Sequence, residues 1–291
     1  MTEARYYSQE ETNLSVAWAR AFSVVSAKHG RELSPFLVSI TGFYDGMVIE
    51  DEGLRYAVDA ALDESGYQSV DTVANTIFPE SLWRRSGRNR TKLFEQYLES
   101  LPDYVAMEPR KNRCGLYFAR LIAFDLDPAT GERLPHMPVQ LASHKSNQLE
   151  FIIRKWQDGI RRRGLFQAGV FDPVRDHIGA ARQPFPCLQH ISLVPDESSG
   201  TLCLNTFYAT QQLFVKAYGN WLGLARLGSF LAHEMGLRFD RLTCFAGIEK
   251  MDRDQRPRSG NLLHRLKDLA QATVRAADAE KVMSLAEVTE D

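Results

Sequence analysis

The stretch FYATQQLFVKAYGNWLGLARLGSFLAHEMGLRFDRLTCFAG (207–247) decides the fold that this sequence predicts. Its apolar middle predicts a long helix over residues 211–236. Residues rich in β-branched and aromatic types favour strands at 165–171, 190–195, 201–209 and 238–248. A tight hairpin is expected at Ser198-Ser199-Gly200. Because strands and helices mix without regular βαβ alternation, the sequence predicts an α+β protein.

The rest of the chain adds helices and a few strands to this unit. Helical spacing of apolar residues predicts helices over 13–28, 53–64, 69–78, 147–160 and 260–275, and strands are expected at 35–41 and 115–124. A basic, turn-rich segment, WRRSGRNRTK (83–92), leads into a short helix that ends near Leu101. No repeat or linker divides the sequence, so we expect a single domain over residues 1–291.

Composition narrows the classes of function. The chain has 291 residues and a formal net charge of −2, which counts against a general nucleic-acid protein. The polar N-terminus has no apolar signal region, and charged residues interrupt the most apolar stretch, so we expect no membrane segment. The four cysteines form no CxxC pair, which favours reduced thiols in the cytoplasm and no metal site.

One cysteine has an unusual setting, because Cys187 follows Pro-Phe-Pro directly ahead of an expected strand. The order of elements after it resembles thymidylate synthase and its pyrimidine-hydroxymethylase relatives. In that family a Pro-Cys pair carries the nucleophile, and a strand, a glycine hairpin, a second strand, a long apolar helix and a further strand follow. The resemblance runs without a gap from Gly200 to Gly247.

The resemblance implies a fold, a reaction and an assembly. The fold would be a mixed sheet flanked by helices in one thymidylate-synthase-like domain, with a divergent part over 1–110 and a polar tail over 276–291. The reaction would add a one-carbon group, methyl or hydroxymethyl, to C5 of a pyrimidine nucleotide, with methylene-tetrahydrofolate as the donor. The assembly would be a homodimer that packs sheet against sheet.

Three residues are candidates for work on the pyrimidine ring. Cys187 would add to C6 as a thiolate, which requires a lowered pKa, whereas many cysteines are buried and inert. Asn220 offers one acceptor and two donors for the N3–H and O4 edge of a uracil, or it caps a helix. Tyr117, in GLYFARL (115–121), would orient a water or help to remove the C5 proton, although strict spacing places Phe118 there.

Other candidates concern the phosphate and the donor. Arg161, Arg162 and Arg163 stand where family members carry arginines that reach the phosphate of the partner subunit. The family's phosphate-holding Gln-Arg-Ser motif falls on Tyr208-Ala209-Thr210, which leaves Thr210 but no arginine. The folate-contacting aspartate falls on Gln212. Arg163, Arg175 or Arg182 could lower the pKa of Cys187.

These departures leave alternatives open. The chain is either a divergent enzyme or a catalytically inactive nucleotide-binding or protein-assembly component on the same fold. A third alternative is nucleic-acid binding through the basic clusters at 83–92 and 161–163, which would weaken steeply with salt.

Overall fold

The computed structural model describes residues 6–27, 31–112, 116–127, 130–132, 134, 146–177 and 186–288. The strands are β1 (Tyr7–Glu11), β2 (Glu32–Leu33), β3 (Phe36–Ile40), β4 (Phe43–Tyr44), β5 (Met47–Val48), β6 (Gln167–Gly169), β7 (Leu188–Asp196), β8 (Thr201–Gln212) and β9 (Arg238–Lys250). The helices are α1 (Leu14–Ala27), α2 (Glu52–Glu64), α3 (Val70–Asn75), α4 (Glu80–Arg85), α5 (Arg90–Met107), α6 (Pro109–Asn112), α7 (Tyr117–Ile122), α8 (Gln148–Gln157), α9 (Pro173–Asp176), α10 (Tyr218–Met235) and α11 (Gly260–Val288).

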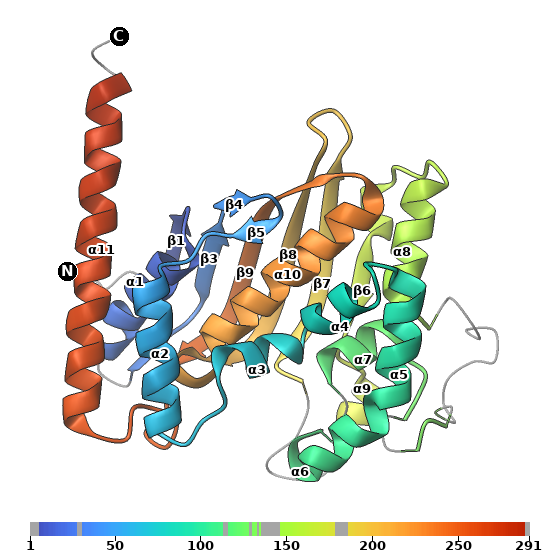
Figure 1. The fold of residues 1–291 in the computed structure, drawn as a ribbon, viewed down its shortest axis with the longest axis horizontal. Helices are drawn as coiled ribbons and strands as arrows, with labels where there is room; N and C mark the ends of the chain where they lie inside the picture. The colour runs from blue at the N-terminus through green and yellow to red at the C-terminus, as the bar shows by residue number, and fades with distance from the viewer. Residues whose placement is uncertain are drawn as a thin grey trace.

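Seven strands form one mixed sheet in the order β1-β3-β9-β8-β7-β6, with β2 paired to β9. β1 runs parallel to β3 and β8 runs parallel to β9, whereas the other pairs in that order are antiparallel. The described helices lie on one face of this sheet (Figure 1). The expectation of an α+β chain with a mixed sheet flanked by helices is therefore confirmed.

α10 is the central helix of the covered face. Trp221 at its start stacks on Phe36 of β3, with ring centroids 6.1 Å apart, and donates a hydrogen bond of 3.0 Å to Gln211 of β8. On its outer side Gly219 and Gly223 lie against α3, where an added Cβ would come within 2.6 Å of Val73 and of the Ala74 peptide oxygen. Only glycine permits this approach, so α10 is fixed between the sheet and α3.

The other face of the sheet carries aromatic and polar side chains that alternate with the buried residues. Phe207 of β8 and Phe245 of β9 stack there with ring centroids 5.5 Å apart, and Phe207 is 41 % exposed. Leu37 of β3 is half-buried and follows the same alternation. This face is not covered by any helix in the described part of the chain (Figure 1).

The structure corrects the strand expected at 115–124, because Tyr117–Ile122 form the helix α7. Phe118, Leu121 and Ile122 are buried at helical spacing, which the apolar and aromatic content of the segment obscured. Arg120 within it is also buried, and its guanidinium forms two hydrogen bonds of 2.6 and 2.7 Å to the Asp176 carboxylate. A partner more than fifty residues away thus decides the local structure, which no local pattern could show.

Other boundaries also differ from the expectation. β8 continues to Gln212 and a π-helical segment, Leu213–Ala217, precedes α10, so the long helix starts later than residue 211. The polar N-terminal segment contains β1, which pairs with β3. α11 runs well past residue 275, and its Lys281 forms an ion pair of 2.8 Å with the buried carboxylate of Glu11.

Candidate functional site

One edge of the sheet brings together the start of β7 and the ends of β8 and β9. The peptide oxygen of Cys187 accepts a hydrogen bond of 3.1 Å from the Ala209 N–H, and Leu188 pairs with Tyr208. Because β8 and β9 are parallel and pair Gln212 with Lys250, both strands end beside Cys187. The chain therefore places its candidate nucleophile at this edge.

The Cys187 thiol reaches solvent, yet enough protein surrounds it to disfavour its charged form. This desolvation raises the pKa of Cys187, while the positive charges of Lys216 and Lys250 act in the opposite direction. The thiol is therefore protonated at neutral pH. These lysines are the cations that favour the thiolate, and the expectation that Arg163 or Arg175 lowers the pKa of Cys187 is not supported. Arg182 lies outside the described residues.

Tyr117, on the first turn of α7, faces Cys187. Burial raises the pKa of Tyr117, and a negative charge on Cys187 would raise it further. Hydrogen bonds from the peptide N–H groups of Cys187 and Leu188 to its hydroxyl lower this pKa. Phe118 is fully buried, with its ring against that of Tyr97 at 4.8 Å. Tyr117, rather than Phe118, is thus the residue next to the thiol.

Tyr208 of β8 is a buried neighbour of Cys187 and Tyr117. It is fully buried, and its hydroxyl has no hydrogen-bond partner in the described part of the chain. Burial raises the pKa of Tyr208 well above the usual value, and Tyr117, Cys244, Cys187 and Glu249 all act on it in the same direction. The thiol and both phenols are therefore neutral weak acids near pH 7.

Asn220 lies inside the first turn of α10, so the expectation that it caps a helix is wrong. Around that turn Tyr218 faces α1, Gly219 faces α3 and Trp221 faces the sheet. At about 100° per residue, the Asn220 side chain points in a different direction from each of these three neighbours. It is 4 % exposed, and its carboxamide has no hydrogen bond to the residues that the structure describes.

Thr210 and Gln212 lie at the C-terminal end of β8, at the same edge of the sheet as Cys187. The Gln212 amide donates a hydrogen bond of 2.7 Å to Asp252, whose carboxylate also pairs with Lys250 at 2.8 Å. The Gln212 carbonyl oxygen is buried and has no partner among the described residues. The Gln212 carbonyl oxygen and the partly exposed Asp252 carboxylate are therefore the acceptors at this end of β8. A contact of Gln212 with a folate stays a prediction.

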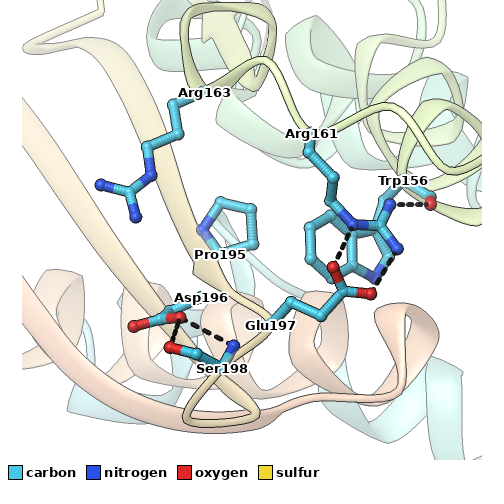
Figure 2. A pocket seen from close by; sticks show the side chains of 7 residues that line it. All are labelled: Trp156, Arg161, Arg163, Pro195, Asp196, Glu197 and Ser198. Atoms are coloured by element: carbon cyan, nitrogen blue, oxygen red, sulfur yellow. Dashed lines mark hydrogen bonds and ion pairs between the residues drawn. The ribbon is translucent and has the colours of Figure 1, made fainter.

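The structure separates Arg161, Arg162 and Arg163 from Cys187 within the same chain. They lie beside the far end of β7, and nine residues of strand span about 26 Å. Figure 2 shows Arg161 over the Trp156 ring, 3.8 Å from its centroid, with hydrogen bonds of 3.0 and 2.9 Å to Glu197. Arg163 lines the same pocket of about 410 Å³ beside Asp196. An arginine contribution across a dimer stays a prediction.

The basic segment 83–92 is not among the charges that act on Cys187. Arg84 pairs with Glu80, and Arg90 pairs with Glu150 and Glu234 at 2.8 Å each. Arg85, Arg88 and Lys92 are exposed and have no ion pair among the described residues. Nucleic-acid binding through this segment stays a prediction.

Sequence reasoning missed Tyr208, Lys216 and Lys250 as neighbours of Cys187. Lys216 is the one charged residue in the apolar segment LFVKA, and this isolated charge was a usable signal. Lys250 and Tyr208 carry no such signal, because only strand register places them at this edge.

Comparisons with known proteins add no identity: no family model matches the chain, and no curated protein matches it significantly. None of the described helices has the length and apolarity needed to cross a bilayer. Among the described residues, no three or more His, Cys, Asp or Glu side chains are grouped so as to hold a metal ion.

Proposed function

We propose that the chain is a divergent thymidylate-synthase-like transferase that adds a one-carbon group, methyl or hydroxymethyl, to C5 of a pyrimidine nucleotide. The observation that carries the proposal is the meeting of Cys187 and Tyr117 at one sheet edge. Asn220 supports it, because its nearly buried carboxamide has no hydrogen-bond partner among the described residues. These side chains are far apart in sequence and suit one flat heterocycle.

Cys187 is the nucleophile of this proposal. Its thiolate attacks C6, the C–S bond forms, and the electrons of the C5–C6 double bond make an enolate. C5 then bonds to the carbon of an electrophilic one-carbon donor, whose carrier leaves with the bonding electron pair. Loss of the C5 proton to water and expulsion of the thiolate restore the ring. Water completes a hydroxymethyl group, whereas a methyl group requires a two-electron reductant that accompanies the donor. Lys216 and Lys250 favour the thiolate that starts this sequence.

Tyr117 and Asn220 take the remaining roles. The Tyr117 hydroxyl keeps its proton at neutral pH, so it acts as a hydrogen-bond donor and orients the water that removes the C5 proton. The Asn220 carboxamide accepts from N3–H and donates to O4, which selects a uracil-type base over a cytosine. Methylene-tetrahydrofolate, the donor that the resemblance implies, stays a prediction.

The alternative is a catalytically inactive nucleotide-binding or assembly component. The raised pKa of Cys187 favours it, because a protonated thiol is a poor nucleophile. The missing phosphate arginine at Ala209 favours it as well.

Formation of a covalent adduct distinguishes the two functions. The chain is incubated with 5-fluoro-deoxyuridylate, with and without methylene-tetrahydrofolate, and intact mass is measured after denaturation. The enzyme gains the mass of the nucleotide, Cys187→Ser does not, and the matched control Cys203→Ser still does. Saturable nucleotide binding without an adduct for several fluorinated pyrimidine nucleotides would favour the inactive component.

We further propose a cytoplasmic homodimer formed by the open face of the sheet. Phe207 and Phe245 stack on that face, and Phe207 is 41 % exposed. Burying such a surface against a second copy removes apolar area from water, and a two-fold axis would use the same face on both subunits.

A further inference from the structure

A second pocket lies where the end of α2 meets the loop between β9 and α11, at the lower left of Figure 1. Its volume is about 350 Å³, and it is lined by Ser65, Gly66, Tyr67, Arg253, Asp254, Arg256, Pro257 and Arg258. The Tyr67 hydroxyl donates a hydrogen bond of 2.6 Å to the Asp254 peptide oxygen, and the Arg258 N–H donates one of 3.3 Å to Ser65. These two bonds fasten the loop to the end of α2, so both walls of the pocket are held in place.

The charge of this pocket is unbalanced. Arg253, Arg256 and Arg258 all line it, and none of their guanidinium groups has an ion-pair partner among the described residues. Asp254 is the single acidic residue in the lining. Three cations against one anion produce a positive potential inside a hollow, where field lines concentrate.

Gly66 shapes the pocket wall. Its φ of +74° is a left-handed conformation that closes the end of α2, and a Cβ there would lie 3.1 Å from an Arg258 guanidinium nitrogen. The absence of a side chain therefore lets the exposed Arg258 lie against the backbone of the pocket wall.

We propose that this pocket binds the diphosphate group of a small ligand. Arginine is the side chain suited to phosphate, because its planar guanidinium offers parallel N–H donors to two oxygens. One carboxylate would engage one or two guanidinium groups, whereas a diphosphate has enough oxygens and charge for all three. The volume is at the lower end of ligand pockets, which fits a small anion.

One hydrogen bond links the neighbourhood of this pocket to a lysine that acts on Cys187. Gln68, which directly follows Tyr67, accepts a hydrogen bond of 3.1 Å from Lys216, one of the two lysines that act on Cys187. The diphosphate can therefore belong to a nucleotide or be inorganic. Either source engages the same arginines, and the proposal holds even if Cys187 forms no adduct.

Calorimetric titration of the full chain with sodium diphosphate at low ionic strength tests the proposal. We expect saturable binding that weakens at least tenfold in the double variant Arg256→Gln/Arg258→Gln. The matched control is Arg85→Gln, which removes an exposed arginine on α4, far from the pocket in sequence, and should leave the affinity within twofold. Uridine diphosphate and uridine serve as the second and third ligands.

Each result decides the matter. Equal affinities for diphosphate and uridine diphosphate assign the site to the inorganic anion, and a much tighter nucleotide assigns it to a nucleotide. The proposal is overturned if diphosphate shows no saturable binding, if Arg85→Gln weakens it as much as the double variant, or if uridine binds as well as its diphosphate. Thermal unfolding of each variant without ligand confirms that the comparison is between folded proteins.

Discussion

Glu249 should make the stability of this protein fall as the pH rises. It is fully buried, neither carboxylate oxygen has a hydrogen-bond partner among the described residues, and burial raises its pKa well above the usual value. The folded state therefore holds a proton that the unfolded state releases above its ordinary pKa near 4.3. For a folded-state pKa raised in this way, the stabilisation is complete below the unfolded pKa and is lost as the pH rises towards the folded pKa.

The size of the effect follows from the single proton. Over the pH range in which the unfolded state has lost the Glu249 proton and the folded state keeps it, the free energy of unfolding falls by about 1.4 kcal/mol per pH unit from this group. Glu249→Gln has no proton to release and removes this slope. The wild-type protein should therefore lose stability relative to Glu249→Gln as the pH rises, by at most about 2.7 kcal/mol over two pH units.

Urea unfolding followed by circular dichroism at pH 6, 7 and 8 measures this slope. The control Glu95→Gln removes an exposed carboxyl on α5 and should follow the wild-type protein at every pH. If the difference in free energy of unfolding between wild type and Glu249→Gln stays constant from pH 6 to pH 8, Glu249 is not held in its protonated form and the reasoning fails.

Two further predictions concern the thiol and the dimer. Because the pKa of Cys187 is raised, its alkylation by iodoacetamide should reach half its maximal rate at a pH above the pKa of a free cysteine, near 8.5. Lys250→Gln should move that midpoint to a still higher pH. Peptide mass spectrometry measures the alkylation rate, and an unchanged midpoint in Lys250→Gln would show that Lys250 does not act on the thiol. Phe207→Asp should convert a dimer to a monomer in sedimentation without loss of helix signal, whereas Phe207→Leu should stay dimeric; a wild-type monomer at micromolar concentration would refute the dimer.

The sequence predicted the fold best where burial on one side leaves a periodic pattern. β7, β8, α10 and β9 all lie close to their expected positions, because alternation and helical spacing report directly which face is buried. α7 was mistaken for a strand, since a short helix with aromatic residues has too few turns to show its period. Arg120 inside it depends on Asp176, a partner that becomes a neighbour only in the folded chain.

The sequence was enough to predict the candidate nucleophile, but not the charged residues that lie near it. Cys187 and Tyr117 were expected on grounds of layout, and the structure brings them together. The order of residues along the chain could not show that Lys216 and Lys250 act on the thiol, because their positions depend on how β8 and β9 end. It also placed Arg161 upstream of Cys187 without showing that a full strand separates them.

One irregularity links the buried acid to the candidate site. Tyr208 of β8 and Ala246 of β9 are buried, but the next fully buried residues are Gln211 and Glu249, three positions on in each strand. Strict alternation would bury every second residue, so both parallel strands change phase together.

The change of phase occurs at Gly247, where an added Cβ would lie 2.9 Å from the Ala209 peptide oxygen. Beyond it Glu249 turns into the core, where its burial destabilises the fold unless it keeps its proton. The same step turns Lys250 towards Cys187. The pairing of β8 with β9 keeps its register through this point, so what changes is which side of the sheet the side chains face. The unfavourable burial of Glu249 and the favourable charge of Lys250 near the thiol are therefore two consequences of one change of side-chain phase.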